Sequence, residues 1–207
     1  MKKILLFLLL SGLCSRGFAQ NHFHVKSGKT FSTFLFRNSE NTKDESLDYI
    51  TNNFLGLSYD FNLGKLHVLR PEVSYREGGA RSEWNNRRLF WKLNYIDINF
   101  AYQIKVLDFE KIKIYQGIAP GVGFLLSGEQ YIGNDYFDVK KTGSLRKMDY
   151  GVNFMANAKI KVIENVYLTV EYRYGLGIRQ IESNRNQSSQ VSRNRFHAAI
   201  FGVAVPL

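Results

Sequence analysis

Charged side chains occupy alternate positions in the stretch LRPEVSYREGG, residues 69–79, where Arg70, Glu72 and Arg76 share one parity. Successive side chains of a β-strand point to opposite faces, so these three charges would meet on one side of a strand. A carboxylate such as Glu72 or Glu171 could act as an acid or base. Neighbouring arginines keep a carboxylate ionised, however, which favours a structural ion pair.

The sequence carries few signatures of catalysis. Its four histidines form no H-E-x-x-H motif, and no G-x-S-x-G motif is present. His22 and His24 share a parity, which leaves an adventitious metal site as a minor alternative. Cys14 is the only cysteine, so no thiol nucleophile or disulfide is expected in an exported chain. We therefore predict a protein that is not an enzyme and has no cofactor.

Residues 1–19 are predicted to be a cleaved export signal. Lys2 and Lys3 precede an apolar run over 4–10, and Gly17 and Ala19 stand at −3 and −1 of a cut before Gln20. The run is shorter than the roughly 20 apolar residues that span a bilayer. One domain, residues 20–207, follows the signal.

The composition suits a folded, exported domain. Hydrophobic residues make up 44% of the 207 residues and aromatic residues 14%, which excludes disorder. The net charge is +10, to which Lys2, Lys3 and Arg16 contribute three. A basic exported chain is expected to meet anionic lipid head groups, and nucleic acid is excluded as a partner.

Alternation of apolar and polar residues recurs along the chain and predicts eight strands. They cover residues 22–36, 55–61, 69–79, 96–104, 112–127, 150–160, 168–178 and 196–207. The longest exceed typical soluble strands and fit the roughly 9–11 residues of a tilted membrane strand. Gly117, Ala119, Gly121 and Gly123 share a face, which leaves room for large side chains opposite.

The connections alternate between long and short. Short connections cover 61–65, 106–111 and 162–166, and long polar ones cover 37–51, 76–91, 127–147 and 179–195. This sorting is typical of outer-membrane barrels. We therefore predict an all-β fold, an eight-stranded antiparallel transmembrane β-barrel with short periplasmic turns and long extracellular loops. Side chains fill the interior of a barrel this narrow.

Five segments resemble the PorT-like outer-membrane β-barrel family of Bacteroidota. They read GKTFSTF, RPEVSYREGGA, KLNYIDINFAYQIK, GIAPGVGFLLSG and VEYRYGLG in this order. The resemblance implies an outer-membrane location and a structural or accessory role linked to protein secretion. The C-terminus departs from the pattern, because it ends in Val205, Pro206 and Leu207 rather than an aromatic residue. A narrow porin and a soluble periplasmic ligand-binding barrel remain the alternatives.

If the apolar face of each strand contacts lipid, ionic side chains of both signs face the lumen. The predicted network comprises Arg70, Glu72, Arg76, Asp97, Lys159, Glu171 and Arg173. Buried charges need partners, so we expect Glu72 to pair with Arg70 or Arg173, and Glu171 with Arg70. A static ion-pair core is favoured over pairs that open for a solute or proton, and over a plug controlled by a partner.

The long connections carry arginines that could hold the phosphates of lipopolysaccharide through planar guanidinium groups. These are Arg81, Arg87, Arg88, Arg185, Arg193 and Arg195. A solvated loop face is the competing interpretation.

Aromatic residues cluster around the second long connection and predict an interfacial girdle, with a protein-binding patch as the alternative. They are Tyr75, Trp84, Phe90, Trp91 and Tyr95. A surface protein or a component of a secretion machinery is the corresponding partner.

Overall fold

The computed structural model describes residues 21–37, 42, 47–84, 87–183 and 191–206. Its strands are β1 (His22–Arg37), β2 (Ile50–Leu63), β3 (His67–Trp84), β4 (Arg87–Asp108), β5 (Ile112–Ile132), β6 (Asp135–Asp138), β7 (Met148–Ile163), β8 (Val166–Gly177) and β9 (Val191–Pro206). The described residues contain no helix long and apolar enough to cross a membrane. The predicted signal lies outside them and stays a prediction.

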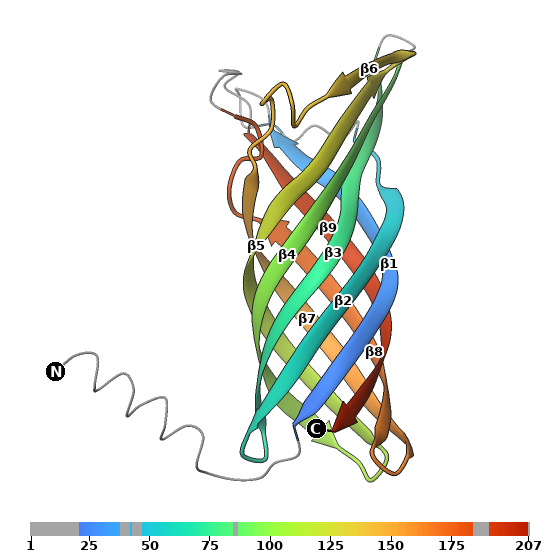
Figure 1. The fold of residues 1–207 in the computed structure, drawn as a ribbon, viewed down its shortest axis with the longest axis vertical. Coiled ribbons are helices and arrows are strands. Elements are labelled where there is room, and N and C mark those ends of the chain that lie inside the picture. Colours follow the sequence, from blue (N-terminus) through green and yellow to red (C-terminus); the bar gives the residue numbers. More distant parts are fainter. Residues whose placement is uncertain (1–20, 38–41, 43–46, 85–86, 184–190, 207) are drawn as a thin grey trace, which may run out of the picture.

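Eight strands close into an antiparallel barrel (Figure 1). Their order is β4–β3–β2–β1–β9–β8–β7–β5, and pairing of β4 with β5 completes the ring. Closure satisfies the backbone hydrogen bonds between strands, as lipid requires. The predicted eight-stranded barrel is confirmed. The short β6, which pairs with the outer end of β5, falls in a segment predicted to be loop.

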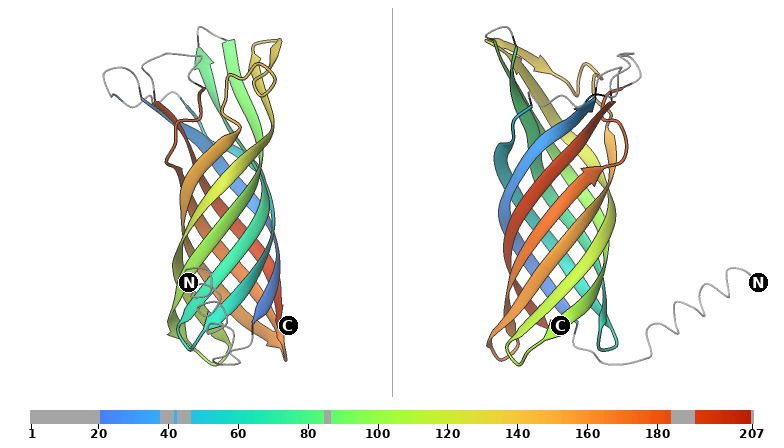
Figure 2. Two further views of the ribbon diagram at one scale, coloured as in Figure 1. Left: turned by 60° about the vertical axis from the view of Figure 1, so that its left-hand side comes forward. Right: turned by 180° about the vertical axis from the view of Figure 1, so that it is seen from behind.

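Three short turns join β2 to β3, β4 to β5 and β7 to β8, at the end where β1 begins and β9 ends (Figures 1 and 2). Two of these turns need a left-handed backbone, which Gly64 (φ 73°) and Asn165 (φ 68°) supply. Three longer connections, between β1 and β2, β5 and β7, and β8 and β9, lie at the opposite, extracellular end, as predicted.

The connection over residues 76–91 was expected to be a loop, and that expectation is wrong. β3 and β4 stay paired up to Glu83 opposite Arg88 and Trp84 opposite Arg87. This hairpin and the end of β5 rise above the rest of the barrel (Figure 2). The outer part of this hairpin is polar because it lies beyond the lipid, although its two strands continue there.

Apolar side chains cover the outside of the barrel and charged ones lie inside. Val73 is 52% exposed and Phe100 64%, whereas Arg70 is 1% exposed and Glu171 2%. This distribution is the reverse of a soluble barrel and matches a lipid-facing wall. It contradicts the alternative of a soluble periplasmic barrel.

The inner face of β5 is made of small residues over 117–123, as predicted. A Cβ atom on Gly121 would lie 2.1 Å from Asn99 Oδ1, and one on Gly123 would lie 2.5 Å from Asp97 Oδ1. Both polar side chains come from the paired strand β4. Because these glycines of β5 have no side chains, they leave the space in which the lumen residues of β4 lie.

Candidate functional site

The lumen is filled by an ion-pair network that we call the inner cluster. It comprises Lys26, Asp60, Arg70, Glu72, Lys159, Glu171 and Arg173, each at most 3% exposed. Asp60 accepts hydrogen bonds from Arg70 Nε and Lys159 Nζ, both at 2.5 Å. His24 Nε2 lies 3.0 Å from the same carboxylate. Three side chains from β1, β3 and β7 thus converge on one residue of β2.

The two glutamates of the inner cluster share their cations. Glu72 contacts Arg173 at 2.6 Å and also Lys26. Glu171 contacts Arg70 Nη1 at 3.1 Å, Lys26 Nζ at 3.4 Å and Arg173 Nε at 3.0 Å. Each carboxylate therefore has at least two cationic partners, which offsets the cost of burying its charge.

Contacts across the lumen join strands on opposite sides of the ring. Arg173 of β8 reaches Glu72 of β3, and Lys159 of β7 reaches Asp60 of β2. Nearer the extracellular end, Asn194 of β9 donates to the Tyr95 hydroxyl of β4 at 3.2 Å. Each pair lies four places apart in the eight-stranded ring, so these side chains cross its full width.

A second ion pair lies above the inner cluster. Arg76 Nε donates to Asp97 at 2.6 Å. The guanidinium lies between the rings of Tyr95 and Phe196, 4.6 Å and 4.7 Å from their centroids, where cation–π attraction adds to the ion pair. The cavity beside it measures about 30 Å³, room for roughly one water.

The buried charges of the described lumen balance. Five basic residues face five acidic ones, if histidine is neutral. They are Lys26, Arg70, Arg76, Lys159 and Arg173 with Asp60, Glu72, Asp97, Asp149 and Glu171. The inner cluster carries one excess positive charge, and the group above it, Arg76 with Asp97 and Asp149, one excess negative charge. The arrangement suits a packed ionic core more than an ion-selective pore.

All seven network residues expected from the sequence lie in the lumen. Five of them form the inner cluster together with Lys26 and Asp60, while Arg76 and Asp97 pair separately. The partner of Glu72 is Arg173 and not Arg70, whose contacts are with Asp60 and Glu171. Lys26 was missed, although its parity with His24 and Thr30 is polar in the sequence.

An apolar cluster from the barrel wall and the loops lies at the extracellular end of the lumen. It comprises Phe34, Ala80, Leu93, Tyr95, Leu125, Val139 and Ile181, with Leu47, Trp91 and Leu145 against it. A pocket of about 310 Å³ remains between Phe34, Trp91, Leu145 and Ile181. Apolar side chains and ionic pairs together obstruct the barrel axis.

The expected aromatic girdle is wrong for two of its five residues. Tyr95 is 1% exposed, and Trp91 packs edge-on against Phe34, 5.8 Å between ring centroids, in the apolar cluster. Both share the inward parity of Asp97, which places them inside. Tyr75 and Phe90 have the outward parity, and the Trp84 side chain lies outside the described part of the chain.

The arginines expected to contact lipopolysaccharide do not form one surface. Arg87 and Arg88 lie exposed at the start of β4, and Arg81 lies 3.4 Å from the exposed carboxylate of Asp48. Arg193 and Arg195 are on β9, on the other side of the barrel. Arg185 lies outside the described residues.

Arg195 lies on β9, near the extracellular end of the barrel. Its guanidinium lies 5.5 Å from the centroid of the Tyr174 ring, and its Nε is buried and has no hydrogen-bond partner in the described structure. Arg179 lies in the same way 5.5 Å from the ring of Tyr150. Both tyrosines belong to the outer wall near its extracellular end, where aromatic residues favour the interface.

A closed antiparallel barrel with apolar residues outside and paired charges inside defines an outer-membrane β-barrel protein. The chain belongs to the family of the outer membrane protein beta-barrel domain, whose model matches residues 18–183. No curated protein matches the sequence.

Two solved outer-membrane barrels share the fold. OprG from Pseudomonas aeruginosa aligns over 91% of this chain and 96% of its own, with 9% identity and a TM-score of 0.53. Neisserial surface protein A aligns over 89% and 97%, with 17% identity and a TM-score of 0.51. The outer-membrane protease OmpT from Escherichia coli aligns over 91% and 97%, with 10% identity and a TM-score of 0.48. At these identities the similarity extends to the fold alone.

Proposed function

We propose that this protein is a non-conducting, non-enzymatic barrel with a structural or accessory role in the outer membrane. The observation that carries the proposal is that side chains of opposite walls meet across the lumen. Arg173 bonds to Glu72 and Lys159 to Asp60 across the lumen, so a solute that passes through would have to break these pairs. The role of such a protein then lies at its two ends and its lipid-facing wall.

The non-enzymatic part of the proposal rests on the state of the carboxylates. A general acid or base must reach its substrate. Glu72 and Glu171 are 3% and 2% exposed, and each is held by two or more cations. They suit a structural core better than proton transfer to a bound molecule.

Conductance in planar lipid bilayers tests the proposal against the narrow porin. We expect the purified, folded barrel to insert without discrete current steps. Steady single-channel steps from the unmodified protein would contradict the proposal. A lumen variant, Arg70→Ala with Arg173→Ala, serves as the opened counterpart, with folding checked by the heat-dependent shift of gel mobility.

The secretion-accessory role is supported by the resemblance to PorT-like barrels. Deletion of the gene in the source bacterium tests it, with the surface proteins compared by mass spectrometry. We expect a subset of exported proteins to disappear from the surface and to return when the intact gene is restored. An unchanged surface proteome would reject this role but would not contradict the proposal that the barrel is non-conducting.

Contact with lipopolysaccharide phosphates is a second candidate function, favoured by the position of the Arg195 guanidinium beside Tyr174 on the outer wall. The test compares Arg193→Gln with Arg195→Gln against Lys111→Gln with Lys161→Gln, an equal loss of charge at the periplasmic end. We expect only the arginine variant to bind phosphorylated lipid A more weakly. Equal binding by both variants would reject the contact.

A further inference from the structure

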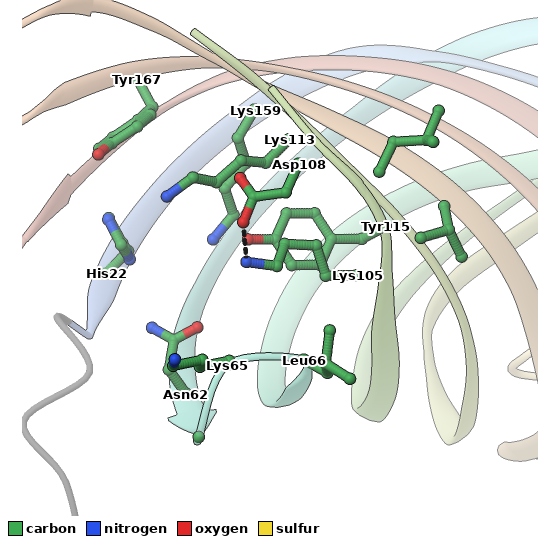
Figure 3. Close-up of a pocket in the computed structure, with 13 residues that line it drawn as sticks. His22, Asn62, Lys65, Leu66, Lys105, Asp108, Lys113, Tyr115, Lys159 and Tyr167 are labelled. Carbon is green, nitrogen blue, oxygen red and sulfur yellow. Dashed lines mark hydrogen bonds and ion pairs between the residues drawn. The ribbon is translucent and has the colours of Figure 1, made fainter. Parts of the chain in front are cut away.

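A pocket of about 540 Å³ opens at the periplasmic end of the barrel, and we call it the periplasmic vestibule (Figure 3). Four lysines line it, each from a different element. Lys65 comes from the β2–β3 turn, Lys105 from β4, Lys113 from β5 and Lys159 from β7. The only acidic residue among its lining residues is Asp108.

Two of the lysines are free to bind a ligand. Lys105 is paired with Asp108, and Lys159 Nζ contacts Asp60 at 2.5 Å. Within the described part of the chain, neither Lys65 nor Lys113 has a carboxylate at salt-bridge distance. Lysine is a point-like cation on a flexible stem, which suits anions of varied geometry.

The floor of the vestibule adds to its positive field. Lys159 belongs to the inner cluster, which holds one more basic than acidic residue. A cleft lined by charge of one sign, with low-dielectric walls, focuses the field and concentrates counter-ions. Because the inner cluster fills the lumen above Lys159, an anion that enters from the periplasm stops at this floor.

The walls combine apolar and polar surface. Leu66, Val106 and Leu107 line one part. On another side His22 packs edge-on against Tyr167, 5.1 Å between ring centroids, and neither ring nitrogen of His22 has a hydrogen-bond partner in the described structure. An apolar wall beside four ammonium groups fits a compact anion with several charges.

We propose that the periplasmic vestibule binds a small multivalent anion through carboxylate or phosphate oxygens. Lys65 and Lys113 supply the direct ion pairs, and Lys105 and Lys159 contribute positive charge while they keep their own partners. The site retains its ligand at the periplasmic mouth and does not conduct it. It is independent of the lipopolysaccharide contact, which lies at the other end of the barrel.

Isothermal titration calorimetry of the folded barrel in detergent tests this site, with citrate and pyrophosphate as probes at low ionic strength. Lys65→Gln with Lys113→Gln is compared with Lys111→Gln and Lys161→Gln, lysines exposed at the same end that do not line the vestibule. We expect about tenfold weaker binding for the first pair only. The probe bound more tightly identifies carboxylate or phosphate as the preferred chemistry.

Three results would overturn the proposal. The first is that neither probe gives a heat of binding. The second is that both lysine double variants bind the probe equally more weakly. The third is that Lys65→Gln with Lys113→Gln leaves binding unchanged. Asp108→Asn is expected to have the opposite effect, because it frees Lys105 from its ion pair and should strengthen binding of the probe. Weaker binding by this variant would also count against the site. All variants are first checked for folding by gel mobility.

Discussion

Arg173 and Glu72 join diametrically opposite walls of the barrel. Arg173 Nη1 donates to Glu72 Oε1 at 2.6 Å, and Nη2 donates to Oε2 at 3.0 Å. Such a bidentate pair fixes direction as well as distance. It holds β8 and β3 at a set separation and occupies the centre of the lumen, so the same contact provides cohesion and closure.

Replacement of Asp60 by Asn should destabilise the barrel strongly. The change leaves Arg70 and Lys159 buried beside a neutral amide, and breaking a buried ion pair costs about 3–5 kcal/mol. Urea unfolding in lipid vesicles measures the effect. Asp135→Asn, at an exposed carboxylate of β6, is the matched control and should change little. Similar losses in the two variants would show that the inner cluster does not stabilise the fold.

Replacement of Gly121 by Ala should strain the contact between β5 and β4. The new methyl group would lie 2.1 Å from Asn99 Oδ1 and 2.8 Å from the carbonyl oxygen of Ile98. Overpacking of this kind costs about 1–3 kcal/mol. Ala156→Val adds bulk on the exposed outer wall instead and is expected to be tolerated. Wild-type stability of Gly121→Ala, measured by urea unfolding, would contradict the role of the small inner face.

Replacement of Val73 by Arg should weaken insertion, because Val73 lies on the lipid-facing wall and is 52% exposed. Arginine at the bilayer midplane costs a transmembrane barrel about 2–4 kcal/mol. Phe137→Arg, on the extracellular β6, is the control. The yield of folded barrel in vesicles gives the readout, and equal yields would place Val73 outside the hydrocarbon.

The membrane-embedded strands could be predicted because lipid imposes a constraint on every second residue. In β4, Ile96, Ile98 and Phe100 alternate with Asp97 and Asn99. Only the face with the apolar residues can meet lipid, so the strand has one possible orientation in the membrane. Above the membrane that constraint ends. The polar hairpin up to Glu83 and Arg88, and the short β6, are paired by backbone hydrogen bonds that the sequence pattern does not reveal.

Parity predicts which side chains face the lumen but not which of them meet. Whether Glu72 meets Arg70 or Arg173 depends on how the ring closes and on the stagger of its strands. Lys26 was missed because Ser27 and Lys29 make the outward parity of β1 polar as well. Lys29 in fact donates to Asn53 Oδ1 on the outer wall at 2.7 Å.

Accessibility of a spin label at Val73 tests the central claim, the orientation of the barrel wall, most directly. Because the only cysteine, Cys14, lies in the predicted signal, Val73→Cys introduces a single site into the exported chain. In lipid vesicles we predict strong relaxation of this label by oxygen and weak relaxation by a water-soluble nickel complex, with the reverse for a label at Thr142→Cys in the extracellular region. Relaxation of the Val73 label by nickel rather than oxygen would contradict the account.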